Sequence, residues 1–206
     1  MRKNLVWDFD GTLYDTYPQM AVALVKALED FHCKADEAEA YALMKKTLFY
    51  AVTVYAERFS LKTEVLLAAF RERHAEQRAF VPMAGLVDCL EATASLGCRH
   101  YLFTHRDHRA VDQLATDGLL RLFTDCVTRE DGFADKPSPE ALLYLMNLHR
   151  FPATEAYMIG DRDIDIDAGN AAGIDGVLLD PGRYYPQVAA RYRIGTLNEL
   201  PALLSK

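Results

Sequence analysis

The chain has 206 residues, of which half are hydrophobic and 26% are charged, the balance of a globular protein with a sizeable core. This length suits one domain, or one domain that carries a smaller inserted one. The formal net charge is −7, so the surface repels phosphate backbones and we do not expect nucleic acid as a partner. A small anion can still bind where local cations and backbone N–H groups gather in a cleft.

The cysteines and the N-terminus indicate the compartment. The four cysteines form no C-x-x-C pair and show no zinc-finger spacing, which favours free thiols in a reducing environment. The first residues lack the apolar stretch of a signal peptide. No segment approaches the ~20 apolar residues that span a bilayer. We therefore predict a cytoplasmic protein with no membrane partner.

The first predicted strand is the apolar run at residues 5–7, which ends in Asp8 and is followed by a turn at Gly11. From about residue 18 to residue 80 the chain is rich in Ala, Leu, Glu and Lys, with apolar residues at helical spacing. This pattern predicts three or four helices, near residues 18–31, 36–56 and 61–79.

After a break at residues 81–85, helices and strands alternate. The predicted helices span residues 86–96, 109–116, 138–149, 163–172 and 198–204, and the predicted strands span 100–103, 126–128, 157–159, 176–179 and 193–195. Alternation implies a parallel sheet covered on both faces. The sequence therefore predicts an α/β fold with a Rossmann-like core, residues 1–15 and 82–206, and a helical insert after the first strand, residues 16–81. Ligands of such sheets bind beyond the carboxyl ends of the strands, so we expect the insert to cover the site as a cap.

Four polar motifs fall at the ends of predicted strands or just before predicted helices. They are Asp8-Phe9-Asp10-Gly11-Thr12, Thr104, Lys136 ahead of Pro-Ser-Pro, and Gly160-Asp161-Arg162-Asp163-Ile164-Asp165. Each motif alone is also typical of a solvated turn. Their joint appearance in this order indicates one site that combines carboxylates, a hydroxyl group and an ammonium group.

Over about residues 4–180 the chain resembles the haloacid dehalogenase superfamily, whose signature is D-x-D-G-T, then Thr or Ser, then Lys, then G-D-x-x-x-D. It is most similar to the phosphoglycolate-phosphatase-like branch, which has a small helical cap between the first two motifs. The resemblance implies a Mg²⁺-dependent phosphatase that hydrolyses a small phosphorylated metabolite through a transient aspartyl-phosphate.

The resemblance also implies the metal ligands. Asp8 and Asp161 supply carboxylates, Asp10 supplies its backbone carbonyl, and Asp165 holds a water molecule on the metal. Oxygen ligands of this kind suit Mg²⁺, a hard cation.

The remaining roles concern the phosphate. By resemblance, Asp8 attacks phosphorus and Asp10 acts as general acid and then general base. Thr104 and Lys136 neutralise charge on the non-bridging oxygens. His105 follows Thr104 and is a further candidate phosphate contact, whereas Arg106 and Arg162 beside the motifs have no assigned role.

Several alternatives stay open to different degrees. A dehalogenase would not need Asp10, since a halide leaves without a proton. A phosphosugar mutase would keep Asp10, but the hexose-1-phosphate mutases have a His where this chain has Met20. A response-regulator receiver, a signalling module of a different class, would lack both the helical insert and Asp10. A non-catalytic binding protein on this scaffold would not need every catalytic position filled. The substrate and the oligomeric state cannot be read from the sequence.

Overall fold

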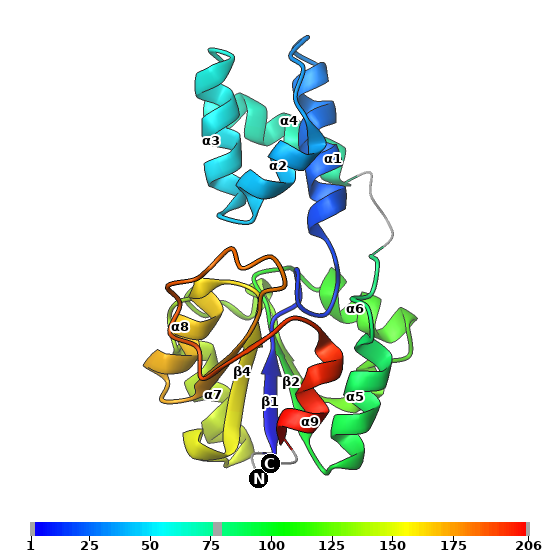
Figure 1. The fold of residues 1–206 in the computed structure, drawn as a ribbon, viewed down its shortest axis with the longest axis vertical. Helices are drawn as coiled ribbons and strands as arrows, with labels where there is room; N and C mark the ends of the chain where they lie inside the picture. The colour runs from blue at the N-terminus through cyan, green and yellow to red at the C-terminus, as the bar shows by residue number, and fades with distance from the viewer. Residues whose placement is uncertain (1–2, 76–79, 205–206) are drawn as a thin grey trace. The chain divides into compact units, whose positions relative to one another are not determined.

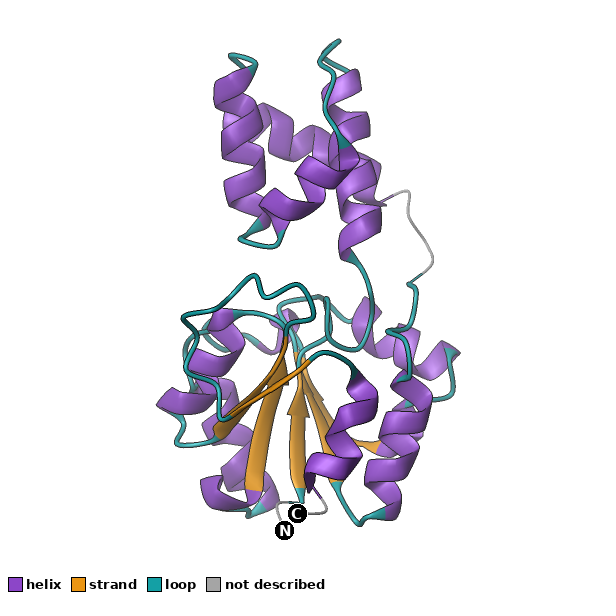
Figure 2. Cartoon of the chain, in the orientation of Figure 1, coloured by secondary structure: helices purple, strands orange, loops and turns teal. Residues whose placement is uncertain are grey.

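The computed structural model describes residues 3–75 and 80–204. The chain divides into two compact units, one made of Met1–Tyr14 and Pro82–Lys206 and the other of Asp15–Val81 (Figure 1). The first unit combines strands and helices, and the second is helical (Figure 2). No helix within residues 3–75 and 80–204 is long and apolar enough to span a membrane.

The first unit is built on one parallel sheet. Its strands are β1 (Asn4–Trp7), β2 (Arg99–Phe103), β3 (Phe123–Val127), β4 (Ala156–Gly160), β5 (Asp175–Leu179) and β6 (Tyr192–Ile194), in the spatial order β3-β2-β1-β4-β5-β6. From β1 the chain builds β2 and β3 on one side and then returns to place β4, β5 and β6 on the other. The predicted α/β, Rossmann-like core is confirmed, and its topological switch point lies between β1 and β4, where ligands of such sheets bind.

The helices of this unit are α5 (Leu86–Ser95), α6 (Arg109–Thr116), α7 (Glu140–His149), α8 (Asp163–Ala171) and α9 (Leu200–Leu204). Two predicted starts were early. Helix α7 begins at Glu140; Ser138 and Pro139 lie between it and the turn at residues 136–137, and the Ser138 hydroxyl accepts the Glu140 backbone N–H at 3.4 Å. Helix α9 begins at Leu200 because a 3₁₀ turn, Leu197–Glu199, precedes it.

Strand β1 is buried on both faces of the sheet. On one face, Val6 packs in a cluster with Tyr101, Met158 and residues of α7 and α8. On the other face, the Trp7 indole N–H donates to His100 Nδ1 at 3.0 Å, and His100 Nε2 lies 3.5 Å from the Thr93 hydroxyl of α5. Helices and side-chain hydrogen bonds therefore hold the strand that precedes Asp8.

The second unit contains α1 (Tyr17–Glu29), α2 (Glu37–Met44), α3 (Leu48–Arg58) and α4 (Thr63–Ala75), packed around a core of its own. The prediction of a single helix over residues 36–56 was wrong. The chain breaks at residues 45–47, where the Thr47 hydroxyl accepts the Tyr50 N–H at 2.9 Å and caps a new helix. Residues 76–79 of the last predicted helix lie outside the described residues.

The buried His100 makes stability depend on pH. Burial lowers the pKa of His100 to about 4, against about 6.5 in an unfolded chain. Between these values the unfolded chain binds a proton that the folded chain does not, so stability falls as pH falls through this window. We predict that wild type loses up to about 3 kcal/mol relative to a His100→Gln variant between pH 7 and pH 4.

The measurement is urea unfolding of both proteins across that pH range. Comparing the two isolates His100 from other titrating groups, and Gln can still accept the Trp7 N–H. His108→Gln, at an exposed position, serves as the control. A wild-type-minus-variant difference that stays constant from pH 7 to pH 4 would contradict this assignment.

Candidate active site

Three of the predicted site residues follow neighbouring strands at the same edge of the sheet. Asp8 follows β1, Thr104 follows β2 and Asp161 follows β4, and all three are buried. The register pairs Trp7 with both Leu102 and Ile159. Because the strands are parallel, their carboxyl ends meet, and segments distant in sequence place these side chains at one edge.

The Lys136 ammonium group joins two of the predicted carboxylates. Its Nζ donates to Asp8 Oδ1 at 2.6 Å and to Asp165 Oδ1 at 2.7 Å, and its side chain is fully buried. One carboxylate oxygen each from Asp8, Asp161 and Asp165 lies within 4.8 Å of the others. The structure therefore brings together three buried carboxylates around one buried ammonium group.

Burial and the excess of negative charge shift the pKa values of the clustered groups. Burial, reinforced by Asp165 and Asp161, raises the pKa of Asp8 to about 7 against the opposing effect of Lys136. Burial alone would also raise the pKa of Asp165, but Lys136 and Arg162 outweigh it and the net shift is downward. Burial opposes charge on Lys136, yet the two carboxylates raise its pKa overall. A hard divalent cation fits this donor set, because it would supply the missing positive charge and accepts oxygen ligands.

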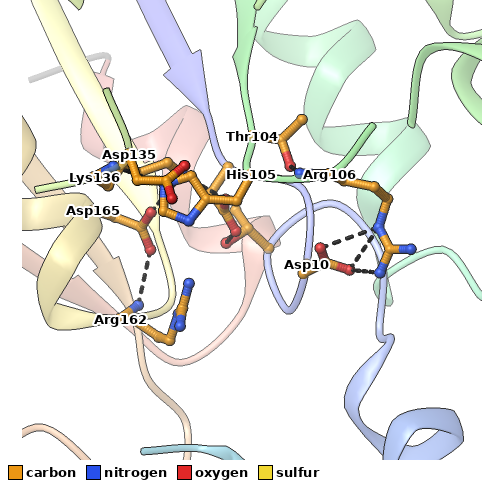
Figure 3. A network of polar contacts seen from close by, with 10 residues as sticks. Asp10, Thr104, His105, Arg106, Asp135, Lys136, Arg162 and Asp165 are labelled. Carbon is orange, nitrogen blue, oxygen red and sulfur yellow. Dashed lines mark hydrogen bonds and ion pairs between the residues drawn. The ribbon is translucent and has the colours of Figure 1, made fainter. Parts of the chain in front are cut away.

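The Asp165 carboxylate occupies a space that only a glycine leaves open. Its second oxygen, Oδ2, accepts the Arg162 backbone N–H at 3.1 Å at the start of α8 (Figure 3). A Cβ atom added to Gly160 would lie only 2.2 Å from the Asp165 Cβ and 2.4 Å from its Cγ. The glycine of the G-D-x-x-x-D motif is therefore required for the close approach of strand β4 to this carboxylate.

Thr104 presents a hydroxyl group with a proton to donate. Its Oγ1 accepts the Arg106 backbone N–H at 3.0 Å, and the side chain is buried. Within residues 3–75 and 80–204, this hydroxyl donates no hydrogen bond. A bound anion at the carboxyl end of β2 would be a suitable acceptor.

Asp10 is held by an arginine that the sequence left without a role. Arg106 Nε lies 3.1 Å from both Asp10 oxygens, and its Nη2 lies 2.5 Å from Oδ1 (Figure 3). The Arg106 side chain is 7% exposed and that of Asp10 is 28% exposed. The more buried guanidinium group thus fixes the more exposed carboxylate.

His105 holds the backbone of Lys136. Its Nε2 accepts the Lys136 backbone N–H at 2.7 Å. Although Asp135 Oδ1 lies 3.7 Å from the same nitrogen, an acceptor nitrogen carries no proton, so the ring is neutral. Burial and the Lys136 charge lower the pKa of His105 to about 4, in agreement. The structure shows a positioning contact, and a direct phosphate contact by His105 stays a prediction.

A further polar residue ends a strand and was missed. Asp180 follows β5, is buried, and accepts the backbone N–H groups of Tyr184 at 2.8 Å and Tyr185 at 3.2 Å, as well as a bond from Arg193. It thereby shapes the loop that carries Tyr185, whose pKa is raised by burial and by nearby Asp161. The strand-end rule that found the other carboxylates would have found this one.

The geometry agrees with the comparison to known proteins. The family model described as haloacid dehalogenase-like hydrolase matches residues 5–179. The chain is 29% identical over 217 residues to a phosphoglycolate phosphatase of Colwellia psychrerythraea, an alignment that covers 97% of this chain and 95% of the relative. It is 27% identical to a phosphoglycolate phosphatase of Pseudomonas savastanoi, with 87% and 70% covered.

Solved structures share the fold. A hydrolase from Streptococcus pneumoniae TIGR4 superimposes with a TM-score of 0.73 at 29% identity, covering 100% of both chains. A predicted phosphoglycolate phosphatase from Haemophilus somnus gives a TM-score of 0.83 at 19% identity, covering 98% of this chain and 97% of the other.

The chain therefore belongs to the haloacid dehalogenase-like hydrolase family. The predicted family, the predicted α/β fold and the prediction of a phosphatase enzyme are confirmed. The roles of individual site residues are treated as proposals below.

The contact between Gly160 and Asp165 gives a testable prediction. A methyl group at Gly160 overlaps the Asp165 side chain, so Gly160→Ala should lower the free energy of unfolding by about 1–3 kcal/mol, the usual cost of overpacking. Gly195→Ala is the matched control, since its Cβ would come no closer than 3.4 Å to another atom, Glu199 Oε1. Urea denaturation measures both variants, and equal stabilities of the two would show that the close approach is not present.

Proposed function

We propose that the chain is a Mg²⁺-dependent phosphatase that forms a transient aspartyl-phosphate on Asp8. One observation carries the proposal: three buried carboxylates and one buried ammonium group lie at the switch point of the sheet. Burying several carboxylates with a single cation is costly unless the site binds further positive charge. A buried cluster of this kind is therefore better explained by a functional site than by fold stability.

Asp8 and Asp161 would hold the metal through their carboxylates, the backbone carbonyl of Asp10 is the predicted further ligand, and Asp165 would hold a water molecule on the metal. When bound, Mg²⁺ would offset the repulsion between an anionic nucleophile and an anionic phosphate ester. The Arg162 backbone N–H and the Lys136 ammonium group hold the two oxygens of Asp165 in a fixed direction.

Asp8 is the proposed nucleophile. It attacks phosphorus with one carboxylate oxygen, the bond to the leaving oxygen breaks, and water later hydrolyses the aspartyl-phosphate. Lys136 orients Asp8 through the 2.6 Å contact and offers positive charge to the phosphate oxygens. The Thr104 hydroxyl, which accepts the Arg106 N–H, donates its own hydrogen to another phosphate oxygen.

Asp10 is the proposed general acid and base. It protonates the leaving oxygen and then takes a proton from the attacking water, a role typically worth ~10²–10⁴ in rate. In the present arrangement Arg106 occupies both Asp10 oxygens. Asp10 must therefore leave part of this ion pair before it can reach the leaving oxygen.

Two finer points accompany the proposal. The substrate is proposed to be a small phosphorylated metabolite, in keeping with the curated relatives, which are phosphoglycolate phosphatases. A cap function of the helical insert, with the predicted boundaries 16–81, and a cytoplasmic location both stay predictions.

The metal requirement is the test of this function. We predict that wild type hydrolyses p-nitrophenyl phosphate, that a chelator abolishes turnover, and that Mg²⁺ restores it. Asp161→Asn should raise the Mg²⁺ concentration for half-maximal rate at least about 10-fold, because one of the two carboxylate ligands is lost.

Asp167→Asn is the matched control, since Asp167 lies on α8 near the cluster but is exposed, and it should respond to Mg²⁺ as wild type does. Full activity of metal-free protein in chelator would contradict the proposed mechanism.

A further inference from the structure

Beside the proposed active site lies a second feature, a cavity of about 210 Å³. It belongs entirely to the α/β unit and opens next to Asp10. Its lining comes from the loops after β1 and β2, the start of α6 and the turn after β3: Asp10, His105, Arg106, Asp107, Arg109 and Arg129. The volume is several times the ~30 Å³ of one water molecule in the liquid, so it has room for a group of several atoms.

The lining is positively charged in a chain whose net charge is −7. Three guanidinium groups face two carboxylates, and the sixth lining side chain, His105, is neutral. Arg109 is engaged by Asp107, with Nε 2.9 Å and 3.0 Å from its two oxygens. Arg106 is engaged by Asp10. Within residues 3–75 and 80–204, no carboxylate forms an ion pair with Arg129.

The position of Arg129 is built into the fold. Its backbone N–H donates to the Arg106 carbonyl at 3.0 Å, which joins the turn after β3 to the loop after β2. The neighbouring acid, Asp131, caps this turn by accepting the Thr128 N–H at 2.7 Å and the Thr128 hydroxyl at 3.0 Å. Asp131 Oδ2 is therefore engaged by Thr128, and the guanidinium group of Arg129 remains available to a ligand.

We propose that this cavity binds an anionic group on the leaving-group side of the substrate. The inference rests on the proposed function, in which Asp10 protonates the leaving oxygen. Because Asp10 also lines the cavity, the rest of the leaving group enters the cavity once the phosphoryl group lies at Asp8. Arg129 and Arg106 then face it, and planar guanidinium forks match the two oxygens of a carboxylate or a second phosphate.

The same anion would act on Asp10. Arg106 now donates to both Asp10 oxygens. A substrate carboxylate or phosphate competes for these donors, so binding of the correct substrate frees Asp10 to reach the leaving oxygen. The cavity thus selects the substrate, and the same binding event releases Asp10, the proposed general acid, from Arg106.

The test compares three two-carbon phosphate esters that differ only at the far end. They are 2-hydroxyethyl phosphate, which is neutral there, phosphoglycolate, which carries a carboxylate, and ethane-1,2-diol bisphosphate, which carries a second phosphate. We expect wild type to prefer one anionic ester over the neutral one by at least about 10-fold in kcat/KM, and the preferred ester identifies the anion. Arg129→Gln should lower that preference about 10- to 100-fold, the usual effect of losing a charged hydrogen bond.

Two further variants sharpen the result. Arg129→Lys keeps the charge without the fork and should retain an intermediate preference. Arg121→Gln is the matched control, because Arg121 is exposed and pairs with Glu91 away from the cavity, and it should keep the wild-type preference. Circular dichroism is the check that each variant is folded.

The outcomes separate the two proposals. A wild-type preference near one, or an Arg129→Gln preference equal to that of wild type, overturns the anion subsite while the phosphatase function stands. If wild type hydrolyses none of the three esters and does not hydrolyse p-nitrophenyl phosphate, the proposed function and this inference are overturned together.

Discussion

The contact of the Lys136 ammonium group with Asp8 and Asp165 is the interaction on which the rest of the site depends. Each charge removed from water costs several kcal/mol unless it is paired at close range. Lys136 supplies that pairing at 2.6 Å and 2.7 Å, with no solvent exposure of its side chain. Its own backbone is fixed in turn by the neutral His105 ring. Loss of this ammonium group would leave two buried carboxylates without the cation that pairs with them.

The same contact explains how the sheet and the site are connected. Strand β1 is buried on both faces, so Asp8 emerges at a defined point beside β4. Gly160 lets Asp165 approach that strand closely. Burial, reinforced by the negative charge beyond what Lys136 balances, raises the pKa of Asp8, and the same negative charge would favour a bound cation in the proposed mechanism. One buried imbalance of charge therefore links the fold to the proposed phosphoryl chemistry.

Local sequence patterns were sufficient to predict the strand ends at which the site residues lie. The strand ends could be found because a short apolar run that stops at a polar residue is visible within a few positions, and parallel topology then places those ends together. The break between α2 and α3 was harder, because apolar spacing runs through it and only the capping hydroxyl of Thr47 marks it. The pairing of Arg106 with Asp10 spans 96 residues, and the contact of Lys136 with Asp8 spans 128. Contacts at such separations follow from tertiary packing and leave no periodic signal; family resemblance supplied the role of Lys136 and said nothing of Arg106.

Chemical trapping of the intermediate tests the central claim most directly. Wild type quenched in acid during turnover of a ³²P-labelled ester, digested and examined by mass spectrometry should carry phosphate on the peptide that contains Asp8. The linkage should be cleaved by hydroxylamine, as an acyl phosphate is, and it should be absent from Asp8→Asn protein. Phosphate on any other residue, or full turnover by a folded Asp8→Asn variant, would contradict the account.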